Sequence, residues 1–357
     1  MGKTARKYYH TLPRLKRGVE PFCPPAGIAG TAGTWEKGAD QLLRGGIPGP
    51  SPDPSDDRGK TFFPGRGMIA PWPRPSAKRP KGTGKRATEG SLGMKDVQAT
   101  ILQRASLRQY DPTPLSEEDR EQILLAAERA PTAGNMMLYT ILEVRDQRIK
   151  DVLAESCDHQ PFIARAPLVL VFLADFQRWQ DFYVASGVED LCTRREESFR
   201  RPQESDLLLA CCDALIAAQN TVIMAESRGI GSCYIGDIME RYEQHRELFS
   251  LPPWAFPITM LCYGRPPAGY RQNLRPRLDR KFFVQQDRYR PWSQEDLEDM
   301  AHQPALLPKK LREGASNPGQ HWYLRKTGEA FSREMERSVR VALRRWLDGD
   351  PEDGGRS

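Results

Sequence analysis

The chain has 357 residues, and its 53 Lys and Arg against 47 Asp and Glu give a formal net charge of +6. The excess lies in residues 1–93, which hold 17 Lys and Arg against 7 Asp and Glu. The other 264 residues therefore have a net charge of about −4. The excess of positive charge is not a property of the part that is expected to fold, and this weakens the interpretation as a nucleic-acid-binding protein.

Other broad classes are disfavoured by the distribution of apolar residues and cysteines. The longest apolar stretch, 207–225, is interrupted by Asp213, Gln219 and Asn220, so the sequence predicts no membrane-spanning helix. The first 30 residues show no secretory signal. The seven cysteines are an odd number without a CxxC motif, which favours a reducing cytoplasm and no metal site.

Three segments differ in composition. In residues 1–93, 29 positions are Gly or Pro, which predicts a disordered basic N-terminal extension. Met94 opens the first stretch of globular character, and we expect a folded domain over 94–290. Residues 291–357 are expected to be a C-terminal extension that carries an amphipathic helix over 331–347.

From Met94 onward, helical and strand patterns alternate. Apolar spacing, capping residues and β-rich runs predict, in chain order, a helical face at 97–102, a helix capped by Ser116 and ended by Pro131, a strand at 139–144, a helix at 149–154, a strand at 168–173, a helix at 206–228, a helix at 240–249 and a strand at 256–263. This order predicts an α+β domain. The helix at 206–228 is apolar on almost all sides, so it must lie in the core or in a subunit interface.

Two short segments carry pairs of arginines. In 104–108 (RASLR) an extended backbone would point Arg104, Ser106 and Arg108 to one side. In 274–278 (LRPRL) Arg275 and Arg277 are spaced in the same way around a proline. Guanidinium groups on one face suit a phosphate, although either motif alone is more typical of a solvated basic surface.

Two further segments combine glycine with small polar residues. Residues 229–237 (GIGSCYIGD) follow the long helix, and their glycines would let the backbone approach a flat ligand or simply end the helix. They do not form a dinucleotide-binding GxGxxG motif, which opens a helix. Residues 131–137 (PTAGNMM) join a helix to a strand and suit either the rim of an aromatic cofactor or an ordinary loop.

Taken in order, these segments resemble the nitroreductase family of FMN-dependent NAD(P)H oxidoreductases, in particular its oxygen-insensitive nitroreductase and flavin reductase branch. The resemblance rests on 104–108, on 213–220 (DALIAAQN), on 234–236 (YIG) and on 274–278, and it covers roughly 96–290. It implies a nitroreductase-like fold, with a mostly antiparallel β-sheet flanked by helices. It also implies an obligate homodimer with the long helix at the interface.

The resemblance implies an FMN site, with NAD(P)H as co-substrate, and it assigns roles to individual residues. The phosphate and the pyrimidine edge would contact Arg104, Ala105, Ser106 and Arg108, and Arg275 and Arg277 would complete the phosphate site. The flavin ring would lie against the remaining candidates: Asn135, Met137, Leu138, Tyr139, Tyr234, Ile235, Gly236 and Asp237. Asp237 stands where the family usually has a second glycine, and Met137 replaces a common polar residue.

The mechanism implied by the family is a ping-pong transfer of hydride from NAD(P)H through flavin N5 to a nitroaromatic, a quinone or a flavin. The flavin performs this chemistry, so no side chain is assigned as a general acid or base. Two alternatives remain open. One is a reductive dehalogenase or flavin-destroying relative of the same fold, and the other is a nucleic-acid-binding protein that acts through its basic N-terminal tail.

Overall fold

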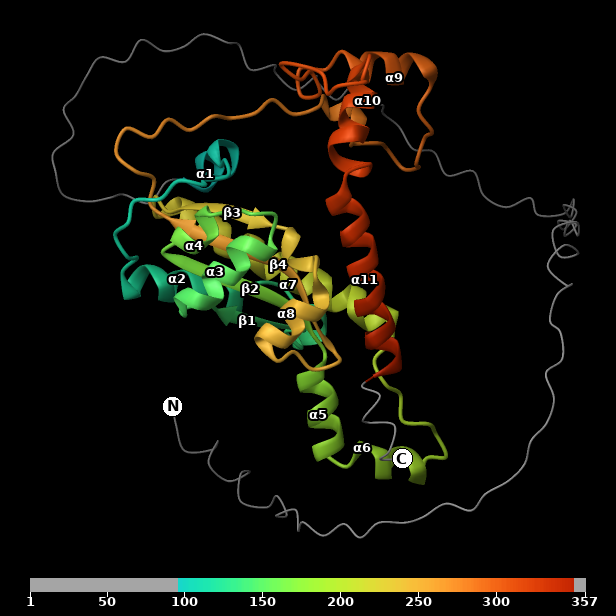
Figure 1. Ribbon diagram of the computed structural model, residues 1–357. Helices are drawn as coiled ribbons and strands as arrows, with labels where there is room; N and C mark the ends of the chain where they lie inside the picture. Colours follow the sequence, from blue (N-terminus) through green and yellow to red (C-terminus); the bar gives the residue numbers. More distant parts are fainter. Residues whose placement is uncertain (1–95, 350–357) are drawn as a thin grey trace, which may run out of the picture. The chain divides into compact units, whose positions relative to one another are not determined.

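The computed structural model describes residues 96–349 (Figure 1). The N-terminal extension expected over 1–93 lies outside the described residues, and so does the start of the domain at Met94.

Four strands form one antiparallel sheet in the described part of the chain. They are β1 (Tyr139–Glu143), β2 (Leu168–Asp175), β3 (Gly231–Ile235) and β4 (Ala255–Gly264), in the order β1-β2-β4-β3. Every residue of β2 is buried, as expected for a continuous apolar run that is covered on both faces. The predicted α+β class and antiparallel sheet are confirmed.

The helices follow the predicted order, with additions. They are α1 (Val97–Gln103), α2 (Glu117–Glu128), α3 (Gln147–Ser156), α4 (Phe162–Arg165), α5 (Gln177–Ala185), α6 (Val188–Arg194), α7 (Glu204–Ser227), α8 (Tyr242–Phe249), α9 (Gln294–Ala301), α10 (Pro318–Trp322) and α11 (Ala330–Asp348). Short turns of helix, η1 (Ala133–Asn135), η2 (Asp237–Met239), η3 (Arg280–Phe282) and η4 (Tyr323–Thr327), lie between them. Five of these helices were not predicted from the sequence: α4, α5, α6, α9 and α10.

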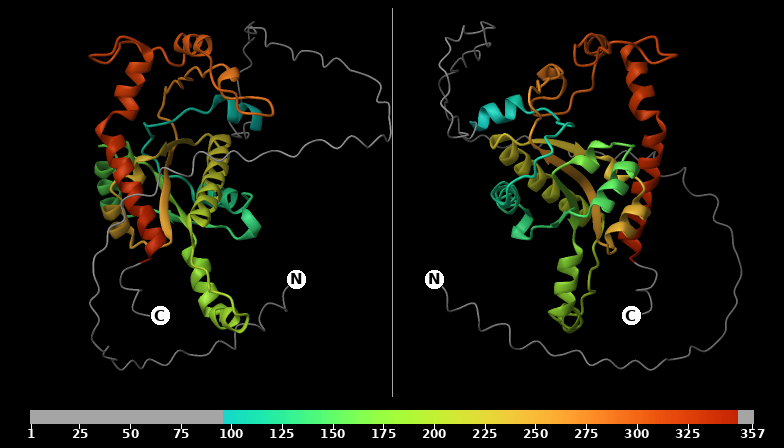
Figure 2. Two further views of the ribbon diagram at one scale, coloured as in Figure 1. Left: turned by 90° about the vertical axis from the view of Figure 1, so that its right-hand side faces the viewer. Right: turned by 60° about the vertical axis from the view of Figure 1, so that its left-hand side comes forward.

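Helices cover both faces of the sheet (Figure 2). On one face, α2 and α7 pack against Phe172, Leu261 and Tyr263. On the other, α3, α4 and η2 pack against alternate residues of the same strands, such as Val171 and Cys262. The two-residue period of the strands thus supplies both layers of the core.

The C-terminal helix α11 joins this core rather than standing apart from it. Trp346 is buried against α7, α8 and β4, and its indole N–H donates to the carbonyl oxygen of Gln203 at 3.0 Å. Figure 1 shows α11 running beside α8. The hydrophobic core therefore includes residues on both sides of 290/291.

Helix α7 has one buried face and one uncovered face. It packs against α2 and all four strands, while Leu208 remains 67% exposed and Leu209, Leu215 and Ile216 are also exposed. By length and composition alone, α7 could cross a membrane, but the buried helix of a protein core meets the same two criteria. Its buried Asp213, which bonds to a neighbouring loop, is typical of a core helix.

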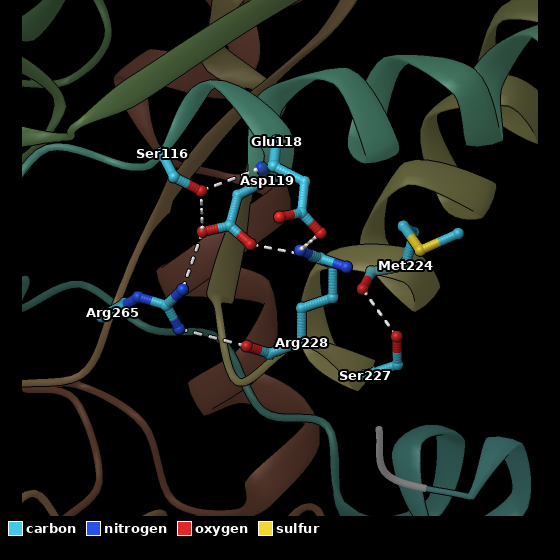
Figure 3. A network of polar contacts seen from close by, with 7 residues as sticks. All are labelled: Ser116, Glu118, Asp119, Met224, Ser227, Arg228 and Arg265. Carbon is cyan, nitrogen blue, oxygen red and sulfur yellow. Dashed lines mark hydrogen bonds and ion pairs between the residues drawn. The ribbon is translucent and has the colours of Figure 1, made fainter. Parts of the chain in front are cut away.

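An ionic network centred on Asp119 ties α2 to the C-terminal end of α7 and to the end of β4 (Figure 3). The buried Asp119 carboxylate accepts from Nε of Arg228 at 2.8 Å and from Nη2 of Arg265 at 2.7 Å. Arg265 also donates to the carbonyl oxygen of Arg228 at 3.1 Å, which gives the helix terminus a partner. Ser116 caps α2 as predicted, through the backbone N–H of Asp119.

Candidate functional site

The arginine segment 104–108 lies along the outer side of β3. Ser106 forms a parallel bridge with Ser232, and the Leu107 N–H donates to the Ser232 carbonyl oxygen at 2.9 Å. Leu107 is buried, whereas Arg108 is exposed and Arg104 and Ser106 are half-buried. The alternation of an extended backbone therefore turns Leu107 into the core and leaves the polar residues at the surface.

Close approach of this segment requires a glycine in β3. A Cβ placed on Gly231 would lie 2.5 Å from Cδ2 of Leu107. The segment 229–237 is thus mainly strand β3, which was not predicted from the sequence. Its first glycines serve packing: Gly229 ends α7 with a φ of 72°, and Gly231 makes room for Leu107.

The two arginines of this segment are free to bind an anion. Among residues 96–349, neither Arg104 nor Arg108 has an ion pair with a carboxylate, and Arg108 lies over the Phe162 ring at 6.0 Å. Burial raises the pKa of the Cys233 thiol, while Arg108, Ser106 and Arg104 act in the opposite direction.

The end of β3 leads into the candidate flavin-lining residues. Ile235 points into the core, and Tyr234 is half-buried with its hydroxyl donating to Oε1 of Gln219 at 3.2 Å. Gly236 is exposed, and a Cβ added there would meet nothing within 4 Å. A side chain at position 236 would therefore cause no clash within the chain, and the space beside Gly236 is open.

Asp213 of α7 organises the loop between α2 and β1. Its carboxylate accepts from the Ala133 N–H at 3.1 Å, from the Leu138 N–H at 3.2 Å and from the Thr132 hydroxyl. From the sequence, Asp213 stood out as a charged residue in an apolar helix and as part of the family motif, but its bonds to this loop were not predicted. Gly134, Asn135 and Met137 have positive φ, so the loop is tightly turned.

The four loop candidates are placed differently. Asn135 and Met137 are exposed, and the Met137 carbonyl oxygen accepts from Arg178. Leu138 and Tyr139 are buried, and the Tyr139 hydroxyl donates to the Ala127 carbonyl oxygen at 2.8 Å. The side chains of Asn135 and Met137 are available to a ligand, whereas those of Leu138 and Tyr139 belong to the core.

Arg275 and Arg277 are not joined to the first arginine segment in this chain. No hydrogen bond or ion pair of the described residues connects either of them to Arg104, Ser106 or Arg108. They instead line an open hollow of about 970 Å³, together with three basic residues that sequence reasoning missed: Lys309, Lys310 and Arg325. The lining contains no carboxylate, so the hollow is strongly basic.

Comparison with known proteins agrees with this geometry. The sequence model of the nitroreductase family matches residues 101–265, which include the first arginine segment, α7 and β3. An FMN reductase [NAD(P)H] of Bacillus subtilis is 32% identical over 196 residues, which cover 55% of this chain and 75% of that protein. The chain belongs to the nitroreductase family.

Two further relatives illustrate the likeness. The oxygen-insensitive NADPH nitroreductase of Salmonella typhimurium is 28% identical over 186 residues, covering 52% of this chain and 71% of that protein. The crystal structure of nitroreductase A from Vibrio parahaemolyticus has a TM-score of 0.57 at 24% identity, with 70% of this chain and 98% of that chain covered. The second likeness supports the nitroreductase-like fold, and family membership makes this protein an oxidoreductase.

Proposed function

We propose that this protein is an FMN-dependent oxidoreductase that uses NAD(P)H as co-substrate. The observation that carries the proposal is the placement of 104–108 along β3, which precedes Gly236, with two arginines that have no carboxylate partner among residues 96–349. The names of the Bacillus subtilis and Salmonella typhimurium relatives, an FMN reductase and an NADPH nitroreductase, point to the same chemistry.

The residues present fit an FMN. Arg104 and Arg108 supply cationic donors for a phosphate or a pyrimidine edge, and Ser106 supplies a hydroxyl between them. The open space at Gly236 would let the backbone lie against a flat ring, and Met137 and Asn135 would border it. A bound flavin supplies two-electron redox chemistry, in alternating half-reactions with NAD(P)H and an acceptor.

We include a homodimer in the proposal. The uncovered face of α7 exposes four large apolar side chains, and α1 adds three more, Val97, Ile101 and Leu102. Apolar residues concentrated on adjacent helices mark an interaction surface. A second copy of the chain would cover this face, and it would also bring a second set of loop residues near each flavin.

The acceptor is proposed to be a nitroaromatic, a quinone or a free flavin. A cytoplasmic location is part of the proposal, because the six cysteines within 96–349 are all free thiols, as a reducing compartment maintains. A stopped-flow acceptor screen on enzyme pre-reduced with NADH or NADPH would identify both substrates. An FMN spectrum that neither nucleotide bleaches would instead favour a relative that uses flavin differently.

The phosphate site gives the sharpest test of the proposal. A charge-assisted contact contributes on the order of 1.5–3 kcal/mol, so Arg104→Ala or Arg277→Ala should weaken FMN binding roughly 10- to 100-fold. Arg271→Ala is the matched control, since Arg271 is exposed and lies just outside the motif. Fluorescence quenching on flavin-free protein measures the affinity, and equal affinity in the Arg277 and Arg271 variants would rule out the second arginine segment.

A further inference from the structure

The turn that follows β3 carries two carboxyl groups close together. Asp237 begins η2, and the Glu240 N–H donates to the Asp237 carbonyl oxygen at 3.0 Å, so both side chains leave a single turn of backbone. This turn starts at Gly236, beside the proposed flavin site. The two carboxyl groups are therefore within electrostatic range of that site.

Asp237 is held by the segment that follows α3. Its Oδ2 accepts from Nε2 of Gln160 at 2.8 Å, and the same amide donates to the carbonyl oxygen of Cys157. The Asp237 carboxylate acts to raise the pKa of the Cys233 thiol, which Arg108 and Arg104 act to lower. Asp237 is thus tied to the end of α3 by the Gln160 side chain.

Glu240 is buried without a matching partner for its charge. It is 5% exposed, and its Oε1 has no hydrogen-bond partner among the described residues. Burial raises its pKa to about 7, and Asp237, Asp158 and Glu334 act in the same direction, against Arg241. An unpaired carboxylate in such a place is costly, so the protonated form is favoured at lower pH.

The titratable and charged groups around Glu240 come from η2 itself and from α3, α8 and α11, which pack on the turn together with β4. They are Asp237 of η2, Cys157 and Asp158 at the end of α3, Arg241 and His245 at α8, and Glu334 of α11. Burial lowers the pKa of His245, whose ring is held between the Ser156 hydroxyl and the Ile238 carbonyl oxygen, both at 2.8 Å. His245 is therefore neutral near pH 7, and Arg241 is the one cation among these neighbours.

We infer that Glu240, whose buried carboxyl has an oxygen without a partner among the described residues, holds a proton near neutral pH, and that loss of this proton adds a negative charge to the turn that starts at Gly236. The inference rests on the proposed function for its consequence at the flavin. An added negative charge there disfavours an anionic reduced cofactor, so reduction of the cofactor becomes harder once Glu240 has lost its proton. Glu240 acts as a positioning residue for charge and need not contact a substrate.

The first experiment needs no flavin. Carboxyl groups of the flavin-free full-length protein, labelled with ¹³C in Glu and Asp, are titrated by NMR between about pH 5 and 9. We expect one carboxyl to titrate near pH 7, to vanish in Glu240→Gln and to shift by roughly one unit toward lower pH in Asp237→Asn. Glu243→Gln is the matched control, because Glu243 lies on the adjacent helix but pairs with Arg337 at the surface.

The second experiment measures the midpoint potential of the FMN-loaded protein against pH. The wild type should show a change of slope near pH 7 that is absent in Glu240→Gln and that moves to lower pH in Asp237→Gly. If no carboxyl titrates near neutral pH in the flavin-free protein, the inferred proton on Glu240 is wrong whether or not FMN binds. If the carboxyl titrates and the wild-type and variant potentials have the same slope, its action on the flavin is wrong. Failure to bind FMN refutes the proposed function alone.

Discussion

Replacing Asp119 by alanine should cost about 3 kcal/mol of the free energy of unfolding, because this carboxylate is the common partner of two arginines. Its side chain is 5% exposed, and it accepts from Arg228 at 2.8 Å and from Arg265 at 2.7 Å. Breaking a fully buried ion pair costs about 3–5 kcal/mol. Arg228 and Arg265 keep 20% and 36% of their side-chain surface in contact with water, so the expected cost falls at the lower end.

Glu118 provides the matched control for this prediction. It pairs with the same Arg228 at 3.0 Å, but its side chain is 76% exposed, so Glu118→Ala should cost roughly 0.5 kcal/mol or less. Urea denaturation of the two variants and the wild type measures the difference. An equal loss of unfolding free energy in both variants would show that the burial of Asp119 does not determine how much its ion pairs stabilise the protein.

The same network predicts a pH dependence with a definite sign. Burial acts to raise the pKa of Asp119, but hydrogen bonds from Arg228 and Ser116 and the charge of Arg265 outweigh it, so the pKa lies below its usual value. The stabilisation is therefore complete above the unfolded pKa of about 3.9 and is lost as pH falls through the lower folded value. The stability gap between wild type and Asp119→Asn should accordingly narrow in acid, and a gap that widened would refute the assignment.

Three other perturbations test the packing, the assembly and the extent of the domain. Gly231→Ala should destabilise by about 1–3 kcal/mol and weaken FMN binding, since its Cβ would strike Leu107, whereas Gly236→Ala should leave the free energy of unfolding unchanged. Leu208→Glu on the uncovered face of α7 should shift the protein toward a monomer in light scattering, and an unchanged dimer would exclude this face. A chain that begins at Met94 should bind FMN and turn over normally, because the core described here starts after it; loss of FMN would show that residues 1–93 contribute.

The central elements of the fold were predictable because each has a strong local pattern. The apolar run of β2 marks a strand that is covered on both faces, and Ser116 marks the start of α2. Strand β3 was missed because Gly231, Ser232 and Cys233 carry little strand propensity, and the strand exists through pairing with β4 and the bridge to Ser106. Tertiary pairing of this kind leaves no mark in a window of sequence.

The candidate site was predictable in its parts but not in its assembly. The placement of Arg104 and Arg108 at the surface agrees with the spacing of their motif. The association of Arg277 with Lys309 and Lys310 could not be predicted, because these residues lie more than 30 positions apart in the chain. The charge of Glu240 was equally hidden, since its environment is built by α3 and α11, which are distant in sequence. Charge environments depend on which elements meet, and a linear sequence does not specify that.

The bridge between Ser106 and Ser232 has a consequence for how the protein reaches its active form. It joins two residues that are separated by more than 100 positions in the chain, and Ser232 also pairs with Tyr263 of β4. Closing a contact of such long range costs chain entropy, because the intervening chain must lose its freedom. The proposed cofactor site thus depends on the folded state of the whole domain, and a ligand that binds only this state adds to its stability in proportion to the logarithm of the ligand concentration. Supply of the cofactor would in this way govern how much of the newly made protein persists.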